Sequence, residues 1–269
     1  MIEWKALVGR ISLFPSQSSP MPSALEAFKT IWGVDPDSFK KQTNPLLPTI
    51  AQGTQSGMMA TCSTNPGRLD VELTPVRSFD LPDSSFPLIE DTRQLHNELE
   101  RIIHAIAQGH VSGLVSRVAL VVHIVTLCSD VAEANKIVTS IMPDQYRVGI
   151  TDEGDFIFQI NQTHASHKIE RIMMNSLRKW SVERFQVLSI RIPMGGAPLP
   201  APTGVTSTNF TKEFLAASLM LESNNVPVSG LPVSDLLAAE EQSSLLLESL
   251  VGIAQAQRVV GLNIEGFEK

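Results

Sequence analysis

A basic segment with aromatic neighbours, residues 163–191, carries the strongest chemical signal in this sequence. It holds six Lys and Arg residues against two Glu residues, a local charge of +4, although the whole chain carries −7. A positive segment attracts acidic surfaces, and Arg and Trp are frequent anchors of protein interfaces. We therefore predict a docking site for an acidic partner protein. Its predicted residues are Lys168, Arg171, Arg178, Lys179, Trp180 and Arg184.

Two other functions remain open at this point. Basic residues interleaved with aromatic ones also contact nucleic-acid phosphates and bases, so a nucleic-acid-binding component that uses the same face is the first alternative. The net charge of −7 disfavours nonspecific duplex binding. The second alternative is a metal-dependent hydrolase. Asp70 and Glu72 lie two residues apart on one face of an expected strand, and paired carboxylates of this kind hold divalent metals.

Motifs for catalysis and for cofactors are missing from the sequence. It has no phosphate-binding Gly-x-x-x-x-Gly-Lys-Ser/Thr, no Gly-x-Gly-x-x-Gly, no Gly-x-Ser-x-Gly and no His-Glu-x-x-His. The two cysteines, Cys62 and Cys128, are too far apart for a Cys-x-x-Cys zinc or redox motif. We therefore expect a non-catalytic protein with no cofactor, no metal and no catalytic residue.

The composition is typical of a packed globular protein. Of the 269 residues, 43% are hydrophobic and 18% are charged. A chain of this length buries enough apolar surface to fold without disulfides or metals. No apolar segment near the N-terminus resembles a signal peptide, and the longest apolar stretch, residues 118–128, is too short to cross a membrane. We expect a soluble, cytoplasmic protein without a membrane partner.

Apolar periodicity predicts the strands that would position these residues. In residues 68–73 the apolar side chains alternate with Arg68, Asp70 and Glu72, which we expect to face solvent. The Val-rich run at residues 117–127 predicts a strand buried on both faces at the centre of a sheet. The predicted strands are 7–13, 58–63, 68–73, 117–127, 146–150, 156–160 and 183–192.

Capping residues predict where the helices begin. Ser23 stands three residues before Glu26, and Asp130 three residues before Glu133, which is the spacing of a capping box. Asp91 begins a further amphipathic helix. Residues 169–180 fit both a helix and a strand, residues 44–57 fit a loop, and Asp35-Pro36 fits a short helical turn anchored by Phe39. The predicted helices are 24–32, 92–108, 131–142, 214–221 and 235–257.

The order of these elements predicts an α+β protein. We expect a mainly antiparallel sheet with helices packed on one face, followed by a C-terminal helical appendage. The composition changes at Pro193, where a stretch of Gly, Pro, Ala and Thr begins. The predicted organisation is a core domain at 1–193, a linker with a short helix at 194–234, and a C-terminal helix and tail at 235–269.

Two segments resemble a sporadically distributed family of uncharacterised prokaryotic α+β proteins. They are Asp152-Glu153-Gly154-Asp155-Phe156-Ile157-Phe158 and Arg184-Phe185-Gln186-Val187-Leu188. The resemblance implies an α+β fold in a prokaryotic protein, and it assigns no residue roles. Combined with the basic segment, it leads us to expect a non-catalytic interaction or regulatory subunit of a prokaryotic multi-protein assembly.

Overall fold

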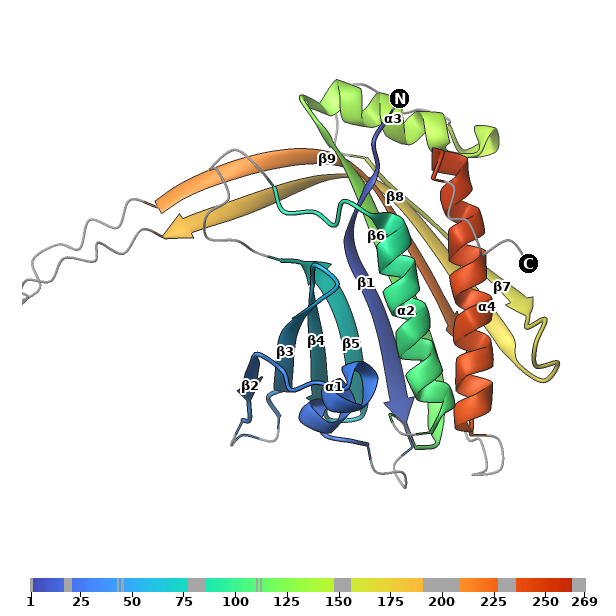
Figure 1. Ribbon diagram of the computed structural model, residues 1–269. Coiled ribbons are helices and arrows are strands. Elements are labelled where there is room, and N and C mark those ends of the chain that lie inside the picture. The colour runs from blue at the N-terminus through green and yellow to red at the C-terminus, as the bar shows by residue number, and fades with distance from the viewer. Residues whose placement is uncertain are drawn as a thin grey trace, which may run out of the picture.

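The described residues form one antiparallel sheet of nine strands in the order β2-β3-β4-β5-β1-β6-β9-β8-β7 (Figure 1). The computed structural model describes residues 2–16, 21–42, 44, 46–76, 86–109, 111, 113–147, 156–190, 209–226 and 236–262. The strands are β1 Lys5–Pro15, β2 Ser38–Lys40, β3 Thr49–Gln55, β4 Met58–Asn65, β5 Arg68–Pro75, β6 Val115–Cys128, β7 Ile157–Ala165, β8 Met173–Ile190 and β9 Asn209–Asn225. The helices are α1 Ala24–Trp32, α2 Thr92–Ala107, α3 Val131–Ile141 and α4 Ala239–Gln257.

Side-chain caps begin three of the four helices at the residues expected from the sequence. Ser23 Oγ accepts a hydrogen bond from the Glu26 amide, and the Glu26 carboxylate accepts one from the Ser23 amide. Asp91 accepts hydrogen bonds from two amides of the first turn of α2. Asp130 caps α3 in the same way. Because each cap satisfies amides that have no partner inside the helix, these helix starts follow from local sequence.

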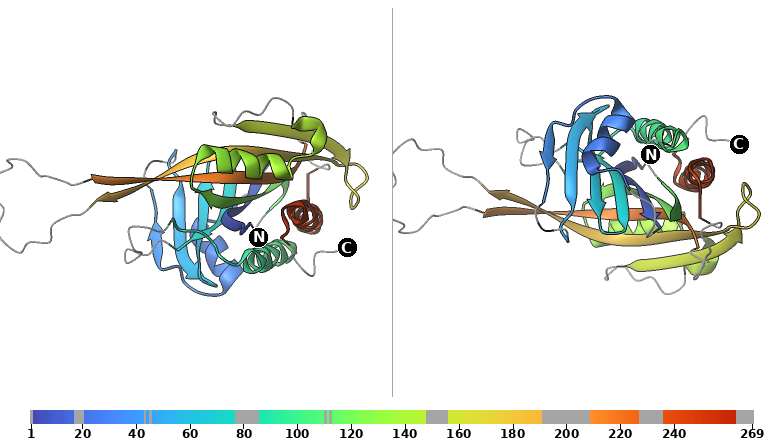
Figure 2. Two further views of the ribbon diagram at one scale, coloured as in Figure 1. Left: turned by 90° about the horizontal axis from the view of Figure 1, so that it is seen from above. Right: turned by 90° about the horizontal axis from the view of Figure 1, so that it is seen from below.

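The helices cover one face of the sheet, where the core lies (Figures 1 and 2). Buried apolar residues of all four helices belong to one cluster with Leu120 and Val122 of β6. Helix α2 approaches β1 most closely at Gly9, where a Cβ atom would lie only 2.7 Å from Leu95 Cδ1. This arrangement confirms the predicted α+β class with helices on one face. No helix in the described part of the chain is long and apolar enough to span a membrane.

Strand β6 lies in the interior of the sheet, as its sequence predicts, between β1 and β9. Its even-numbered residues, such as Leu120 and Ile124, join the helix-covered core. Its odd-numbered residues Ala119, Val121 and Val125 are also buried, but on the opposite face of the sheet, outside that core cluster. The two faces of β6 therefore have different surroundings. Substitutions on the two faces should change the stability of the protein by different amounts.

The expected short helix at residues 214–221 is wrong, because these residues belong to strand β9. Strand β9 pairs with β6 on one side and with β8 on the other. Its Leu, Ala and Met residues favour helices in isolation, but pairing on both edges overrides that preference. The predicted boundary at residue 193 therefore falls between two strands of one sheet. Residues 191–208 and 227–235 lie outside the described residues.

Two further expectations in the first part of the chain are wrong. Residues 44–57 are not all loop, because they contain β3, which pairs with β4 across a tight turn. Ser56 and Gly57 both adopt positive φ angles in that turn, of 48° and 71°. The residues after Asp35-Pro36 form the short strand β2 instead of a helical turn, and Phe39 is 43% exposed instead of buried. Short polar strands of this kind lack a strong apolar period.

The undecided segment at residues 169–180 is a strand from Met173 onward. It is continuous with the predicted strand at 183–192, so both form β8, which pairs with β7 and β9. The predicted strands at 146–150 and 156–160 are found only in part. Tyr146 ends a short 3₁₀ helix, residues 148–155 lie outside the described residues, and the second strand belongs to β7, which pairs with β8.

Candidate functional site

The six residues predicted to dock an acidic partner do not share one face. Side chains alternate along a strand. Arg178, Trp180 and Arg184 of β8 therefore point to the side of the sheet that carries the helices, and Lys179 points to the other. Lys168 and Arg171 lie in the loop between β7 and β8. Trp180 is only 3% exposed and packs in the core beside Phe158. The expected continuous basic and aromatic patch is therefore divided.

Three of these cations form ion pairs. Arg171 Nη2 lies 2.7 Å from Glu241 Oε1, and Lys179 Nζ lies 3.0 Å from Glu183 Oε1. Arg184 Nη1 lies 2.9 Å from a carboxylate oxygen of Glu213. Two of the three carboxylates come from β9 and α4, outside the segment whose charge was counted. These two carboxylates reduce the local charge from +4 to +2 in the folded protein.

The remaining two cations, Lys168 and Arg178, line a groove between α4 and the outer strands of the sheet. We call it the α4 groove and define it by His164, Lys168, Met174, Arg178, Leu247 and Val251. Its volume is about 1250 Å³. Residues of β7 and β8 form one side, and residues of α4 form the other. The groove brings two of the predicted site residues together.

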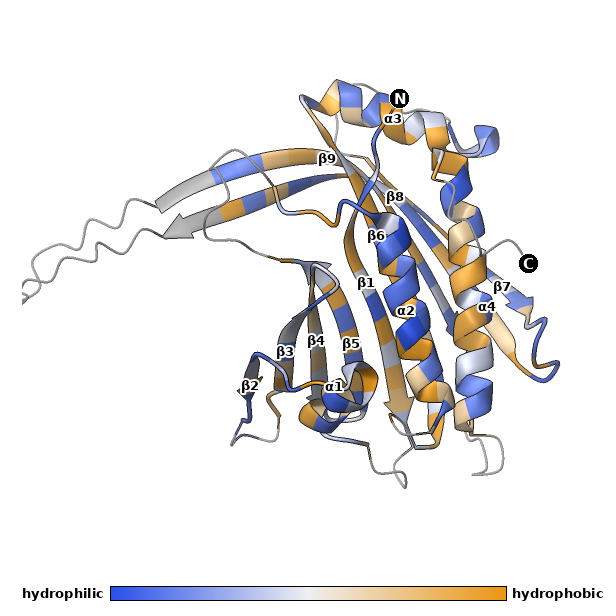
Figure 3. Ribbon diagram, viewed as in Figure 1, coloured by the Kyte–Doolittle hydropathy of each residue, from blue (hydrophilic) through white to orange (hydrophobic). Residues whose placement is uncertain are grey.

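Helix α4 is apolar on two sides. Leu246, Leu250 and other residues face the core, whereas Leu247 and Val251 are half-buried and face the groove. In Figure 3 the middle of α4 is mostly orange and white, while much of the neighbouring α2 is blue. A helix that only covers a sheet needs one apolar stripe. The predicted helix at 235–257 corresponds to α4, but its second apolar stripe was not predicted. The leucine and valine residues of α4 are the sequence signal for that stripe.

Arg178 is the more buried of the two predicted cations in the groove. Its side chain is half-buried, and no carboxylate of the described residues lies within ion-pair distance of it. Three carboxylates, those of Glu100, Glu222 and Glu248, also line the groove. Glu222 lies 3.6 Å from Arg117. Glu248 accepts hydrogen bonds from Ser166 Oγ at 2.6 Å and from the His167 amide at 2.9 Å. These bonds fasten the β7–β8 loop to α4. The groove therefore presents a positive guanidinium beside an apolar wall.

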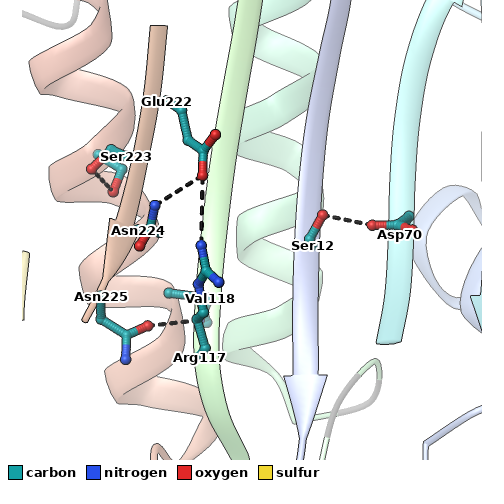
Figure 4. Close-up of polar contacts among 9 residues, drawn as sticks. Ser12, Asp70, Arg117, Val118, Glu222, Ser223, Asn224 and Asn225 are labelled. Atoms are coloured by element: carbon teal, nitrogen blue, oxygen red, sulfur yellow. Dashed lines mark hydrogen bonds and ion pairs between the residues drawn. The ribbon is translucent and has the colours of Figure 1, made fainter. Parts of the chain in front are cut away.

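Polar residues at the end of β9 hold the floor of the groove against α4 (Figure 4). Ser249 Oγ of α4 donates a hydrogen bond to Ser223 Oγ at 2.8 Å. The Asn225 side-chain oxygen accepts a hydrogen bond from the Val118 amide at 2.7 Å, and its nitrogen donates to the Ser116 carbonyl at 3.1 Å. The side-chain amide of Asn225 thus makes the hydrogen bonds to β6 that the backbone of one further β9 residue would make. The Ser223–Ser249 hydrogen bond thus joins β9 to α4, and the Asn225 hydrogen bonds join β9 to β6.

The opposite face of the sheet brings a serine, a histidine and a glutamate together without forming a nucleophilic triad. His123 Nε2 lies 2.6 Å from Ser218 Oγ and 3.6 Å from Glu183 Oε2. In a triad the acid contacts the other ring nitrogen and orients it. Both partners here approach the same nitrogen, and Ser218 is fully buried. The arrangement stabilises the sheet and offers no reactive hydroxyl to a substrate.

His123 makes the stability of the protein depend on pH. Burial lowers the pKa of His123; the negative charge of Glu183 opposes this and the positive charge of Lys179 reinforces it. The folded protein therefore holds fewer protons than the unfolded chain around and below pH ~6.5, so the free energy of unfolding should fall as the pH falls. Chemical denaturation at pH values of about 7 and about 5 measures this loss.

Two histidine variants separate the contributions to this pH dependence. Burial also lowers the pKa of His96, so His123→Gln should remove part of the slope and His96 should account for a remaining part. His96→Gln, the second variant, should remove that remaining part. An unchanged slope in His123→Gln would contradict the assignment.

Asp70 and Glu72 do not form an open metal site. Asp70 was expected to face solvent but is only 5% exposed. Its Oδ1 accepts a hydrogen bond from Ser12 Oγ and its Oδ2 one from Arg68 Nε, both at 2.6 Å (Figure 4 shows the first). Burial raises the pKa of Glu72, which disfavours the ionised form that a metal needs. The described residues contain no group of three His, Cys, Asp or Glu side chains suited to a metal.

Similarity of the whole chain to known proteins does not identify the function of the groove. No family model, curated protein or solved structure matches this chain. The resemblance inferred from residues 152–158 and 184–188 therefore stays a prediction, and residues 152–155 lie outside the described residues. The geometry and the lining residues of the α4 groove make it the strongest candidate site in the described part of the chain.

Proposed function

We propose that this protein is a non-catalytic binding protein that takes an acidic, partly apolar segment of a partner protein into the α4 groove. The observation that carries the proposal is Arg178, a half-buried cation without a carboxylate partner among the described residues, beside the apolar side of α4. A carboxylate that reaches a guanidinium in such a site forms a charge-assisted hydrogen bond. Lys168 adds a second positive charge in the same groove.

The size and lining of the groove favour a peptide segment over a small metabolite. A volume of about 1250 Å³ exceeds the range of ~300–1000 Å³ that is typical of small-molecule sites. Leu247 and Val251 offer contacts to apolar side chains on the helix side, and β7 and β8 carry polar side chains such as Gln162 and Ser176. An extended peptide with alternating acidic and apolar residues matches both sides.

The same geometry favours a protein partner over a nucleic acid. Nucleic-acid sites need several cations along a backbone and accessible aromatic faces on which bases stack. Trp180, the aromatic residue that suggested stacking, is 3% exposed. Arg171, Lys179 and Arg184 already pair with carboxylates. Only two predicted cations remain for a ligand of the groove.

Arg178→Gln should weaken binding of an acidic peptide by about tenfold to about a hundredfold. Hydrogen bonds to charged groups contribute about 1.5–3 kcal/mol, and about 1.4 kcal/mol corresponds to tenfold in affinity. Fluorescence anisotropy with a labelled peptide of alternating Glu and Leu residues measures the change, with the corresponding Lys and Leu peptide as the negative probe. The matched control is Arg184→Gln, because Arg184 pairs with Glu213 away from the groove.

A steric variant tests the groove independently of charge. Gly252 lies in α4 at the groove, is exposed, and a Cβ atom added there meets nothing within 4 Å. Gly252→Phe should therefore keep the fold and block the peptide, whereas Gly252→Ala should bind normally and be more stable by up to about 1 kcal/mol. Peptide affinity that is unchanged in both Arg178→Gln and Gly252→Phe would contradict the proposal. Arg178-dependent binding of a single-stranded oligonucleotide but of no peptide would favour the nucleic-acid alternative.

A further inference from the structure

Strand β7 forms one outer edge of the sheet and lacks the usual protection of such edges. It is nine residues long and pairs only with β8 within the described part of the chain. Natural edge strands avoid pairing with other chains by being short, by carrying Lys or Pro, or by bulging. Strand β2 at the other edge follows this rule, with three residues ending in Lys40. β7 has neither Lys nor Pro, and its register with β8 is unbroken.

The sequence of β7 is complementary to itself in the antiparallel direction. When two copies pair over their full length, Asn161 lies at the two-fold axis opposite Asn161 of the second copy. Ile157, which is 67% exposed, then lies opposite Ala165, and Gln159 lies opposite Thr163. Side chains directly opposite each other in a sheet interact, and like charges there repel. β7 contains no Asp, Glu, Lys or Arg, so self-pairing brings no such charges together.

We propose that β7 pairs with β7 of a second copy of this chain, which joins the two sheets into one across a two-fold axis. The backbone amides and carbonyls at the outer edge of β7 then find partners, and the exposed Ile157 is covered. An interface that uses the same patch on both copies closes after two subunits, so the expected assembly is a dimer. A strand of a different protein has no such residue-by-residue match to β7.

The two-fold axis runs perpendicular to the joined sheet, because opposite residues of an antiparallel pair point to the same face. The helices and the α4 groove of both copies therefore lie on one side of the assembly. β7 also contributes His164 to the groove, so the two grooves lie near the shared edge. The dimer does not depend on what the groove binds, and its test is independent of the proposed function.

The oligomeric state of the full chain tests the proposal directly. Light scattering after gel filtration should give a dimer mass for the wild type. Asn161→Lys places two positive charges opposite each other at the axis, and it should give a monomer with unchanged secondary structure. The matched control is Asn97→Lys on the exposed side of α2, which should remain a dimer. A wild type that is monomeric at all concentrations tested would overturn the proposal. It would do so even if hydrogen exchange showed that contacts within the chain protect the β7 amides.

A disulfide test fixes the register and the symmetry. Opposite Cα atoms in antiparallel strands lie about 4.5–5.5 Å apart, which suits a disulfide. In a background with Cys128→Ser, Asn161→Cys should form a disulfide-linked dimer under mild oxidation, because the residue faces its own copy. Thr163→Cys, which would face Gln159 of the other copy, should not. Equal cross-linking of both variants, or of neither, would overturn the two-fold pairing.

Discussion

A fragment that ends at residue 193 is expected to remain unfolded or to aggregate. It retains β6 and β8 but lacks β9, which lies between them and pairs with both. It also lacks α4, whose Leu246 and Leu250 are fully buried in the common core. Strand edges and apolar surface left open in this way cause aggregation. Soluble yield, circular dichroism and thermal unfolding of the fragment measure the effect.

Cleavage of the intact protein provides the matched control for this truncation. A protease cut between Gly195 and Gly204 removes no strand, so the two pieces should stay associated and the nicked protein should unfold cooperatively. Mixing separately produced 1–193 and 209–269 chains should restore structure that neither has alone. A soluble 1–193 fragment with a cooperative transition of its own would contradict this expectation and would restore the two-part organisation predicted from composition.

Leu120→Asp should unfold the protein, and Val121→Asp should not. Both residues lie in the middle of β6 and are buried, at 0% and 5% exposure. Leu120 faces the apolar core, where an unpaired carboxylate costs more than about 4 kcal/mol. Val121 lies opposite Arg10 of β1, whose buried Nε has no hydrogen-bond partner among the described residues. A carboxylate at 121 gains that partner, so we expect a loss of only about 1–3 kcal/mol.

Val121→Asn separates the charge from the change in shape. Asn has nearly the same size as Asp and cannot form an ion pair with Arg10, so Val121→Asp should be the more stable of the two near neutral pH. Glu222 flanks position 121 on the other side, but its carboxylate is already engaged by Asn224 and lies near Arg117. Urea unfolding measures which of the two variants is more stable. If Asn is tolerated better than Asp, Arg10 does not compensate a charge at this position.

The sequence predicts those parts of the fold that depend on neighbouring residues. Ser23, Asp91 and Asp130 cap helices because they bond to amides two or three residues away, and the Val-rich run of β6 marks an inner strand wherever it lies in the chain. The capped helices, strands β4 and β5 and the antiparallel α+β class could therefore be predicted. Strand β9 could not, because its partners are distant in sequence and its composition favours a helix.

The candidate site was predicted only in part, for a similar reason. A charge count along residues 163–191 cannot include Glu213 and Glu241, which pair with Arg184 and Arg171 in the folded protein. It also cannot separate Arg178 from Lys179, whose side chains point to opposite faces once the segment is known to be a strand. Lys168 and Arg178 are the two predicted residues that the fold brings together in the groove. Leu247 and Val251 complete it from a helix that the prediction treated as separate.

The position of β9 also affects how the chain folds during synthesis. The ribosome completes β1 to β6, which can form a partial sheet with the Val-rich edge of β6 open, before it completes β7 and β8, which can pair as a separate hairpin. These two units join only when residues 209–225 emerge and enter between them. Such late, long-range pairing is slow, and a nascent chain with open apolar edges is a substrate for chaperones. Translation between residues 190 and 225 is therefore the period in which this protein is most exposed to misassembly.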